Sequence, residues 1–92
     1  MTFEKPDPDK FEGFALAMRA AKEGGSMPTV FNAANEEAVA MFLKGDIGFT
    51  DIADGIEAAM KAHRNIEDPS LKDIFNTEEE ARSFIRRFTE NK

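Results

Sequence analysis

The chain has 92 residues, of which 41% are hydrophobic and 33% charged, and its formal net charge at pH 7 is −6. At this length, a single hydrophobic core is only just sufficient to keep the chain folded. The lack of cysteine excludes disulfides and cysteine-ligated metals. No dense run of Lys and Arg, long apolar run or signal peptide is present, so we expect a cytoplasmic protein that binds neither nucleic acid nor membrane.

The N-terminal residues 1–12 are predicted to form an extended leader, because Pro6 and Pro8 fix the backbone and lack amide donors. Phe3 and Phe11 are its expected anchors on the core. A first helix is predicted over residues 13–23 and ends at Gly24-Gly25, since glycine adopts the left-handed C-cap conformation readily. Its predicted core face consists of Phe14, Leu16, Ala17, Ala20 and Ala21.

Two further helices are predicted in the middle of the chain. The second starts at Ser26-Met27-Pro28, with proline in the first turn, and stops at Gly45. Its apolar residues recur every three or four positions, which predicts a broad buried stripe and a central place: Phe31, Ala34, Ala38, Met41 and Phe42, widened by Val30, Val39 and Leu43. Ile47 is expected to be tucked inward. The third helix is predicted to be capped by Thr50, with an inner face of Ile52, Ile56, Ala59, Met60 and His63.

The C-terminal third contains two capping-box patterns. Ser70 with Asp73 predicts a short helical turn over residues 71–75, and Thr77 with Glu80 predicts the start of a last helix. The inner stripe of that helix is Ala81, Phe84, Ile85 and Phe88. No segment alternates with period two. The predicted fold is therefore all-α: residues 1–92 form one compact four-helix bundle-like domain with an extended N-terminal leader and an extra short helical turn.

Residues that could carry chemistry do not converge in this sequence. The single histidine, His63, lacks a second ligand or an evident orienting group, so a capping or packing role is favoured. Neighbouring carboxylates such as Glu36 and Glu37 point about 100° apart on a helix, which argues against a shared metal. Gly24-Gly25-Ser26 is better explained as a helix break than as a phosphate cradle. We therefore expect no catalytic, cofactor-binding or metal-binding residue in this chain.

The segment Asn32-Ala33-Ala34-Asn35-Glu36 is unusual because asparagine is a poor helix former, yet Asn35 falls on the apolar stripe. One interpretation is a polar pin in which Asn35 bonds the backbone of a neighbouring loop. The other is a polar contact with another domain. Asn32, Asn35 and Glu36 are therefore the candidate structural or interdomain residues.

Four segments of the sequence carry a family resemblance: residues 2–7 (Thr-Phe-Glu-Lys-Pro-Asp), 24–30 (Gly-Gly-Ser-Met-Pro-Thr-Val), 32–36 (Asn-Ala-Ala-Asn-Glu) and 47–52 (Ile-Gly-Phe-Thr-Asp-Ile). In order and spacing they resemble the C-terminal helical domain of the 1-deoxy-D-xylulose 5-phosphate reductoisomerases. Residues 11–14 depart from the family, which commonly has a Phe-Pro pair there, and Met1 suggests an engineered start or a renumbered fragment.

The resemblance implies a parent enzyme of the non-mevalonate isoprenoid route. That enzyme uses NADPH and a divalent metal, Mg²⁺ or Mn²⁺, and its cofactor, metal and phosphate sites lie upstream of the matched region. No catalytic residue is carried over to this chain.

Three hypotheses about function follow. In the first, the chain is a non-catalytic fragment that packs against the parent's catalytic domain, exposes an apolar patch and self-associates when isolated. In the second, it is a stand-alone interaction or assembly module. In the third, it is a small enzyme with a pocket lined by Asn32, Asn35, Glu36 and His63.

Overall fold

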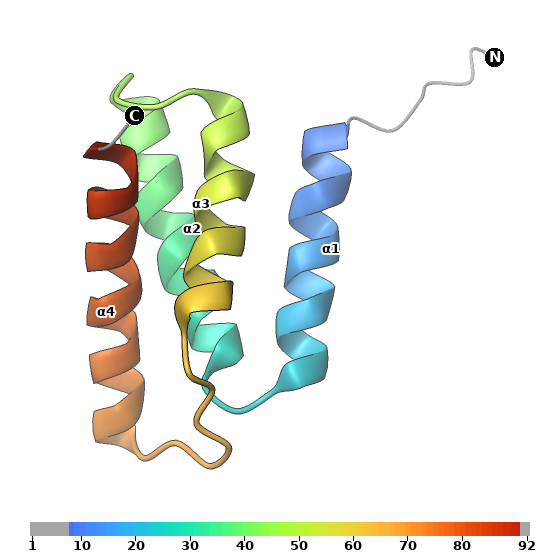
Figure 1. Ribbon diagram of the computed structural model, residues 1–92, viewed down its shortest axis with the longest axis vertical. Helices are drawn as coiled ribbons and strands as arrows, with labels where there is room; N and C mark the ends of the chain where they lie inside the picture. The colour runs from blue at the N-terminus through green and yellow to red at the C-terminus, as the bar shows by residue number, and fades with distance from the viewer. Residues whose placement is uncertain (1–7, 91–92) are drawn as a thin grey trace, which may run out of the picture.

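The computed structural model describes residues 8–90, with side chains from residue 13 onward, and contains four α-helices in that range. They are α1 (Pro8–Glu23), α2 (Met27–Leu43), α3 (Phe49–Ala62) and α4 (Leu71–Glu90), and no strand occurs between residues 8 and 90. Figure 1 shows the helices side by side along the long axis of the molecule. The predicted all-α, bundle-like fold class is confirmed.

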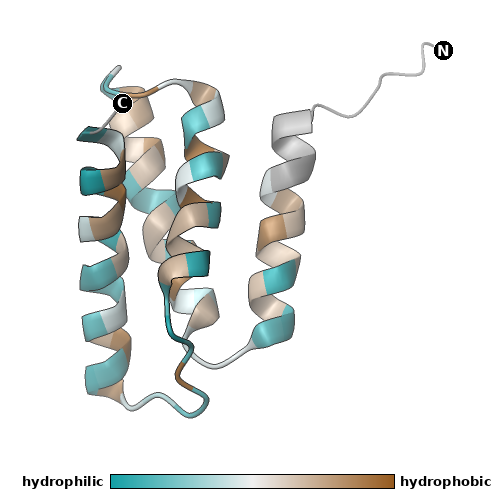
Figure 2. Ribbon diagram, in the orientation of Figure 1, coloured by the Kyte–Doolittle hydropathy of each residue, from teal (hydrophilic) through white to brown (hydrophobic). Residues whose placement is uncertain are grey.

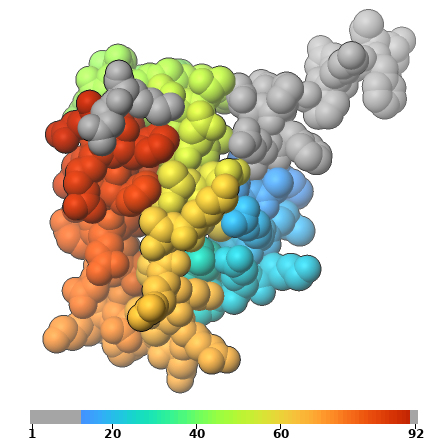
Figure 3. Space-filling model, in the orientation of Figure 1, coloured from blue at the N-terminus to red at the C-terminus, as the bar shows by residue number. Residues whose placement is uncertain are grey.

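Helices α2 and α3 form the centre of this bundle. Each contacts all three other helices, whereas α1 and α4 do not contact one another within the described residues. Figures 1 and 3 place α1 along one edge of the molecule and α4 along the opposite edge. The central position predicted for the second helix is confirmed.

The hydrophobic core lies between the four helices, and its most deeply buried side chains are where α2, α3 and α4 meet. Ala34 and Ile85 are fully buried, and Val30 and Ile56 are each 2% exposed. Small residues on α2 let the neighbouring helices approach closely, and Phe31, Met41, Phe42, Ile52 and Phe84 pack around them. Ile47 is buried as predicted. In Figure 2, hydrophilic colour is frequent along α4, as expected for an amphipathic helix at the edge of a bundle.

The start of α1 differs from the prediction. The helix begins at Pro8, so the predicted extended leader is wrong for residues 8–12, and residues 1–7 with Phe3 lie outside the described part, as does the side chain of Phe11. Proline favours the first helical turn because its missing N–H has no partner there. The predicted inner face is also partly wrong: Leu16 and Ala20 are buried, whereas Phe14 is 65% exposed and Ala21 is exposed.

Helix α4 is continuous, so the predicted separate turn over residues 71–75 is wrong. Its capping box is present, because Asp73 N donates to Ser70 Oγ (3.1 Å) and Ser70 N donates to Asp73 Oδ2 (3.0 Å). Thr77 does not start a new helix; it is 2% exposed on the inner face. Neither Gly nor Pro occurs between residues 71 and 90. Nothing therefore interrupts the helix once Thr77 packs inward.

Two smaller predictions on the α2–α3 connection are also wrong. Gly48, not Thr50, is the N-cap of α3, and Asp51 accepts a hydrogen bond from the Gly48 amide at 2.9 Å. Leu43, expected on the buried stripe, is 77% exposed at the end of α2.

Candidate functional site

A polar cluster surrounds Ser26, at the turn between α1 and α2. Its hydroxyl lies 2.7 Å from His63 Nε2, accepts a hydrogen bond from Ile66 N (2.8 Å) and donates to Asn65 Oδ1 (3.1 Å). Its amide donates to Ile66 O and to Asn65 Oδ1, both at 2.9 Å. The cluster therefore joins the start of α2 to the segment that follows α3.

The two glycines before Ser26 make this approach possible. Gly24 and Gly25 have φ values of +65° and +60°, which confirms the predicted left-handed helix break. A Cβ on Gly25 would overlap the Ile66 carbonyl oxygen and lie 2.7 Å from Asn65 Oδ1, whereas one on Gly24 would meet no atom within 4 Å. Gly25 is therefore needed for both its backbone conformation and its close contact.

A serine hydroxyl beside an imidazole resembles a nucleophile and its base. Here Ser26 is 0% exposed and its hydroxyl is surrounded by protein groups, so it has no access to a substrate. The contact between Ser26 and His63 is therefore structural, and it joins the α1–α2 turn to the end of α3. Sequence reasoning missed it because residues 26 and 63 are 37 positions apart, and only the Gly-Gly-Ser turn signalled close packing at one end.

His63 is the C-cap residue of α3, which confirms the predicted capping and packing role. Its pKa is lowered from 6.5, chiefly because partial burial disfavours the charged ring, while the negative charge of Glu80 opposes this.

This lowered pKa predicts that the domain loses stability in mild acid. The unfolded chain binds a proton at His63 below about pH 6.5, whereas the folded chain resists protonation until a lower pH. The stabilisation from neutral His63 is therefore complete above the unfolded pKa and declines as pH falls toward the folded pKa. Urea denaturation at a series of pH values between about 7.5 and 5.5 measures this decline.

The matched control for this prediction is His63→Gln, which removes the titrating ring and keeps a polar side chain. We expect a flatter pH dependence for the variant than for the unmodified chain over this interval. Equal slopes for both proteins would contradict the assignment to His63.

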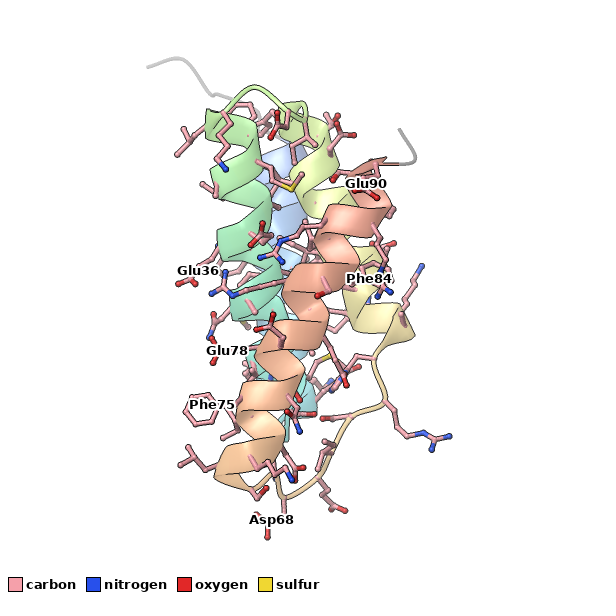
Figure 4. All side chains as sticks on the ribbon, turned by 90° about the vertical axis from the view of Figure 1, so that its left-hand side faces the viewer. Glu36, Asp68, Phe75, Glu78, Phe84 and Glu90 are labelled. Atoms are coloured by element: carbon pink, nitrogen blue, oxygen red, sulfur yellow. The ribbon has the colours of Figure 1, made fainter. Side chains whose placement is uncertain are left out.

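His63 also lines a half-open pocket of about 200 Å³ between α2, α3 and α4, together with Glu80, Phe84 and Arg87. This volume is below the roughly 300–1,000 Å³ of most small-molecule sites. Figure 4 shows Phe84 on α4, the helix that supplies one wall of this pocket. The pocket by itself does not define a ligand-binding site.

The three candidate residues on α2 do not form one site. Asn32 is exposed, and Glu36 accepts a hydrogen bond from Arg82 of α4 at 2.6 Å. Asn35 is half-buried and lines a separate apolar groove of about 240 Å³ with residues of α1 and α3, including Gly13, Phe49 and Ile56. Among the described residues no loop backbone bonds its amide, so the predicted polar pin is not found there.

Glu36 belongs instead to an ion-pair network between α2 and α4. Arg82 lies 3.6 Å from Glu37 and 3.9 Å from Glu78, and Arg86 lies 3.2 Å from Glu37. The hydrogen bond from Arg82 to Glu36 is the main cause of the raised pKa of Arg82. Figure 4 shows Glu36 and Glu78 on the same side of the molecule. The network links α2 to α4, and its carboxylates are paired with arginine side chains.

Neither a metal-binding cluster nor a membrane-spanning helix occurs between residues 8 and 90. No group of three or more His, Asp or Glu side chains there has an arrangement that fits a metal ion. In the same part of the chain, no helix has both the length and the apolar character needed to cross a bilayer.

The fold and its polar ties define a small helical domain without an evident reaction centre of its own in the described residues. Residues 1–84 match the family model described as the DXP reductoisomerase C-terminal domain, and the chain belongs to that family.

Relatives support this assignment over nearly the whole chain. The chain is 53% identical over 85 residues to the 1-deoxy-D-xylulose 5-phosphate reductoisomerase of Agathobacter rectalis, and 51% identical to that of a Thermoanaerobacter species. These matches cover 92% of this chain and 22% of each relative, so the chain spans about a fifth of their length.

A solved structure has the same fold. The 1-deoxy-D-xylulose 5-phosphate reductoisomerase from Zymomonas mobilis in complex with NADPH superposes with a TM-score of 0.82 at 43% identity. The match covers 98% of this chain and 24% of that one.

Proposed function

We propose that this domain is a non-catalytic part of a 1-deoxy-D-xylulose 5-phosphate reductoisomerase that packs against the catalytic domain and supports it. In this proposal the whole enzyme acts in non-mevalonate isoprenoid biosynthesis, and its NADPH and divalent-metal sites lie outside this chain. The observation that carries the proposal is the 53% identity to a reductoisomerase over 85 residues, almost the full length of the chain.

Two features of the described residues favour a domain that supports the catalytic domain over an independent small enzyme. First, the residues expected to line the pocket of a small enzyme do not meet. Asn35 lines the groove beside α1, His63 lines the pocket beside α4, and Glu36 pairs with Arg82. In addition, six large apolar side chains are exposed: Phe14, Met18, Leu43, Phe49, Leu71 and Phe75. These residues are spread over the four helices, and the pairs on α1 (Phe14, Met18) and on α4 (Leu71, Phe75) are candidates for contact with a neighbouring domain.

A domain exchange tests this function. The corresponding C-terminal region of the Agathobacter rectalis enzyme is replaced by this chain, and NADPH oxidation with 1-deoxy-D-xylulose 5-phosphate is compared with that of the intact and the truncated enzyme. We expect the truncated enzyme to lose activity and the chimera to recover it to within about tenfold of the intact enzyme, because the supporting contacts are restored.

Two outcomes would contradict the proposal: a truncated enzyme as active and stable as the intact one, or a chimera no better than the truncated form. In the second case, a defined dimer of the 92-residue chain in solution would favour the stand-alone assembly module instead.

A further inference from the structure

The apolar groove between α1, α2 and α3 has the size of one aromatic ring. Its volume is about 240 Å³, and its walls are Gly13 of α1, side chains of residues 31–39 of α2 and side chains of residues 49–56 of α3. An apolar cavity of about 150 Å³ already binds benzene, whereas most small-molecule sites measure roughly 300–1,000 Å³. The groove therefore fits a single inserted side chain better than it fits a cofactor.

One polar side chain lies in this apolar groove. Asn35 of α2 is half-buried and lines it together with Phe31 and Ile52, and among the described residues no loop backbone bonds its amide. A peptide backbone offers both N–H and C=O groups to such an amide, whereas a purely apolar occupant would leave it without a partner. The groove is therefore suited to an occupant that combines one large apolar side chain with exposed backbone beside it.

The segment that precedes α1, residues 1–7, has this composition. Phe3 is its only aromatic residue and stands between the polar residues Thr2 and Glu4. In extended backbone, successive side chains point to opposite sides, so Phe3 can enter a groove while Thr2 and Glu4 stay in water. Pro6 favours extended backbone in the residue before it. One ring-sized groove and one ring on a polar segment therefore match.

The same segment joins α1 close to the groove. Gly13, which forms the α1 wall, comes five residues after Pro8, or about 7.5 Å along the helix. Phe3 comes five residues before Pro8, and five residues of extended chain reach up to about 17 Å. Nothing lies within 4 Å of a Cβ added to Gly13, so the groove is open on the α1 side. Phe3 is therefore within reach of the groove.

The other hollows of the domain suit this segment less well. The pocket beside His63 lies at the far end of α1, because His63 contacts Ser26 just after the glycine turn (Figure 1). That end is about 24 Å along α1 from its start, farther than the roughly 17 Å that five residues span. The hollow on the outer side of α1 is within reach, but it is shallow, so a ring placed there would stay largely in water.

We propose that the apolar groove is the docking site of residues 1–7 of this same chain, with the ring of Phe3 inserted beside the amide of Asn35. Docking also covers Phe49, which lines the groove and is 49% exposed. The docked segment holds the start of α1 against α2 and α3, at the end opposite to the glycine turn. This inference does not depend on the proposed function, because the groove and its occupant belong to one chain.

Cysteine labelling tests this docking directly, because the chain contains no cysteine of its own. Val39→Cys places a thiol of similar size in the groove, and its reaction with a thiol reagent is followed by peptide mass analysis. The rate is compared between the 92-residue chain with Phe3 and the same chain carrying Phe3→Ser. We expect Phe3→Ser to raise the rate at least about threefold, since the docked ring protects the groove.

Matched variants isolate the effect of Phe3. Phe14→Ser removes a ring that is 65% exposed on α1 and is expected to leave the labelling of Val39→Cys unchanged. Ala40→Cys, exposed on α2 and outside the groove, is expected to react at the same rate with Phe3 and with Phe3→Ser. The helical circular dichroism signal of the Phe3→Ser chain is expected to match that of the unmodified chain, so a faster rate reports an uncovered groove.

Two results would overturn the proposal. Equal Val39→Cys rates with Phe3 and with Phe3→Ser would show that this ring does not cover the groove. Protection that increases with protein concentration would show that the occupant is a second copy of the chain and not the segment joined to α1.

Discussion

Replacing Ile85 by alanine is expected to lower the free energy of unfolding by about 2–5 kcal/mol, which is the range for truncating a large aliphatic side chain in a core. Ile85 of α4 is 0% exposed. A Cβ added to Gly55 of α3 would lie 3.2 Å from Ile85 Cδ1, so the two helices are closely packed at this point. Urea denaturation followed by the helical circular dichroism signal measures the loss.

The matched control is Phe75→Ala on the same helix. It removes a larger apolar side chain, but from a position that is 60% exposed, so a change within about 0.5 kcal/mol is expected. Similar losses for Ile85→Ala and Phe75→Ala would contradict the placement of the core between α2, α3 and α4.

Replacing Gly25 by alanine is expected to destabilise the domain by about 2–4 kcal/mol. The left-handed backbone at φ +60° contributes about 1 kcal/mol of this. The remainder, about 1–3 kcal/mol, comes from moving the turn away from Ile66 and Asn65, which disrupts the buried hydrogen bonds of Ser26.

Gly24→Ala separates these two causes. Gly24 has nearly the same φ value, +65°, but nothing lies within 4 Å of an added Cβ, so only the backbone part of about 1 kcal/mol is expected. Equal losses for the two variants would indicate that the contact with residues 65 and 66 contributes nothing. Denaturant unfolding of both proteins under identical conditions provides the comparison.

Local signals in the sequence predicted most of the helical framework. The glycines at 24 and 25 end α1, Pro28 lies in the first turn of α2, and the Ser70–Asp73 capping box opens α4. These features depend on residues within one turn of each other, so their physics is contained in a short stretch of sequence. The same local periodicity correctly predicted the burial of Val30, Ala34, Ile56 and Ile85, each at most 2% exposed.

Errors arose where local signals were ambiguous. Helix α1 is apolar on both sides, and periodicity alone does not say which side meets the bundle; Phe14 was therefore assigned to the core although it is exposed. Thr77 and Glu80 form a capping pattern, but burial of Thr77 against the bundle keeps α4 continuous. In both cases, packing against helices distant in the sequence decided the outcome: which side of α1 is buried, and whether a new helix begins at Thr77.

The family to which the chain belongs was predicted from the sequence alone, because four short segments appear in the same order and spacing as in that family. The absence of a catalytic residue remains a prediction for the chain as a whole. The interdomain role of Asn32, Asn35 and Glu36 is likewise still untested.

Only the tertiary structure decided which polar groups meet. Ser26 contacts residues 37 to 40 positions away, and Glu36 pairs with Arg82, 46 positions away. No local pattern encodes such partners, because they are set by how the helices pack once the loops have closed. The sequence by itself predicted where α1 ends, where α2 begins and which family the chain belongs to, but not where α1 and the last helix begin. The packing decided which face of α1 is left uncovered, since both of its faces are apolar and only one can lie against α2 and α3.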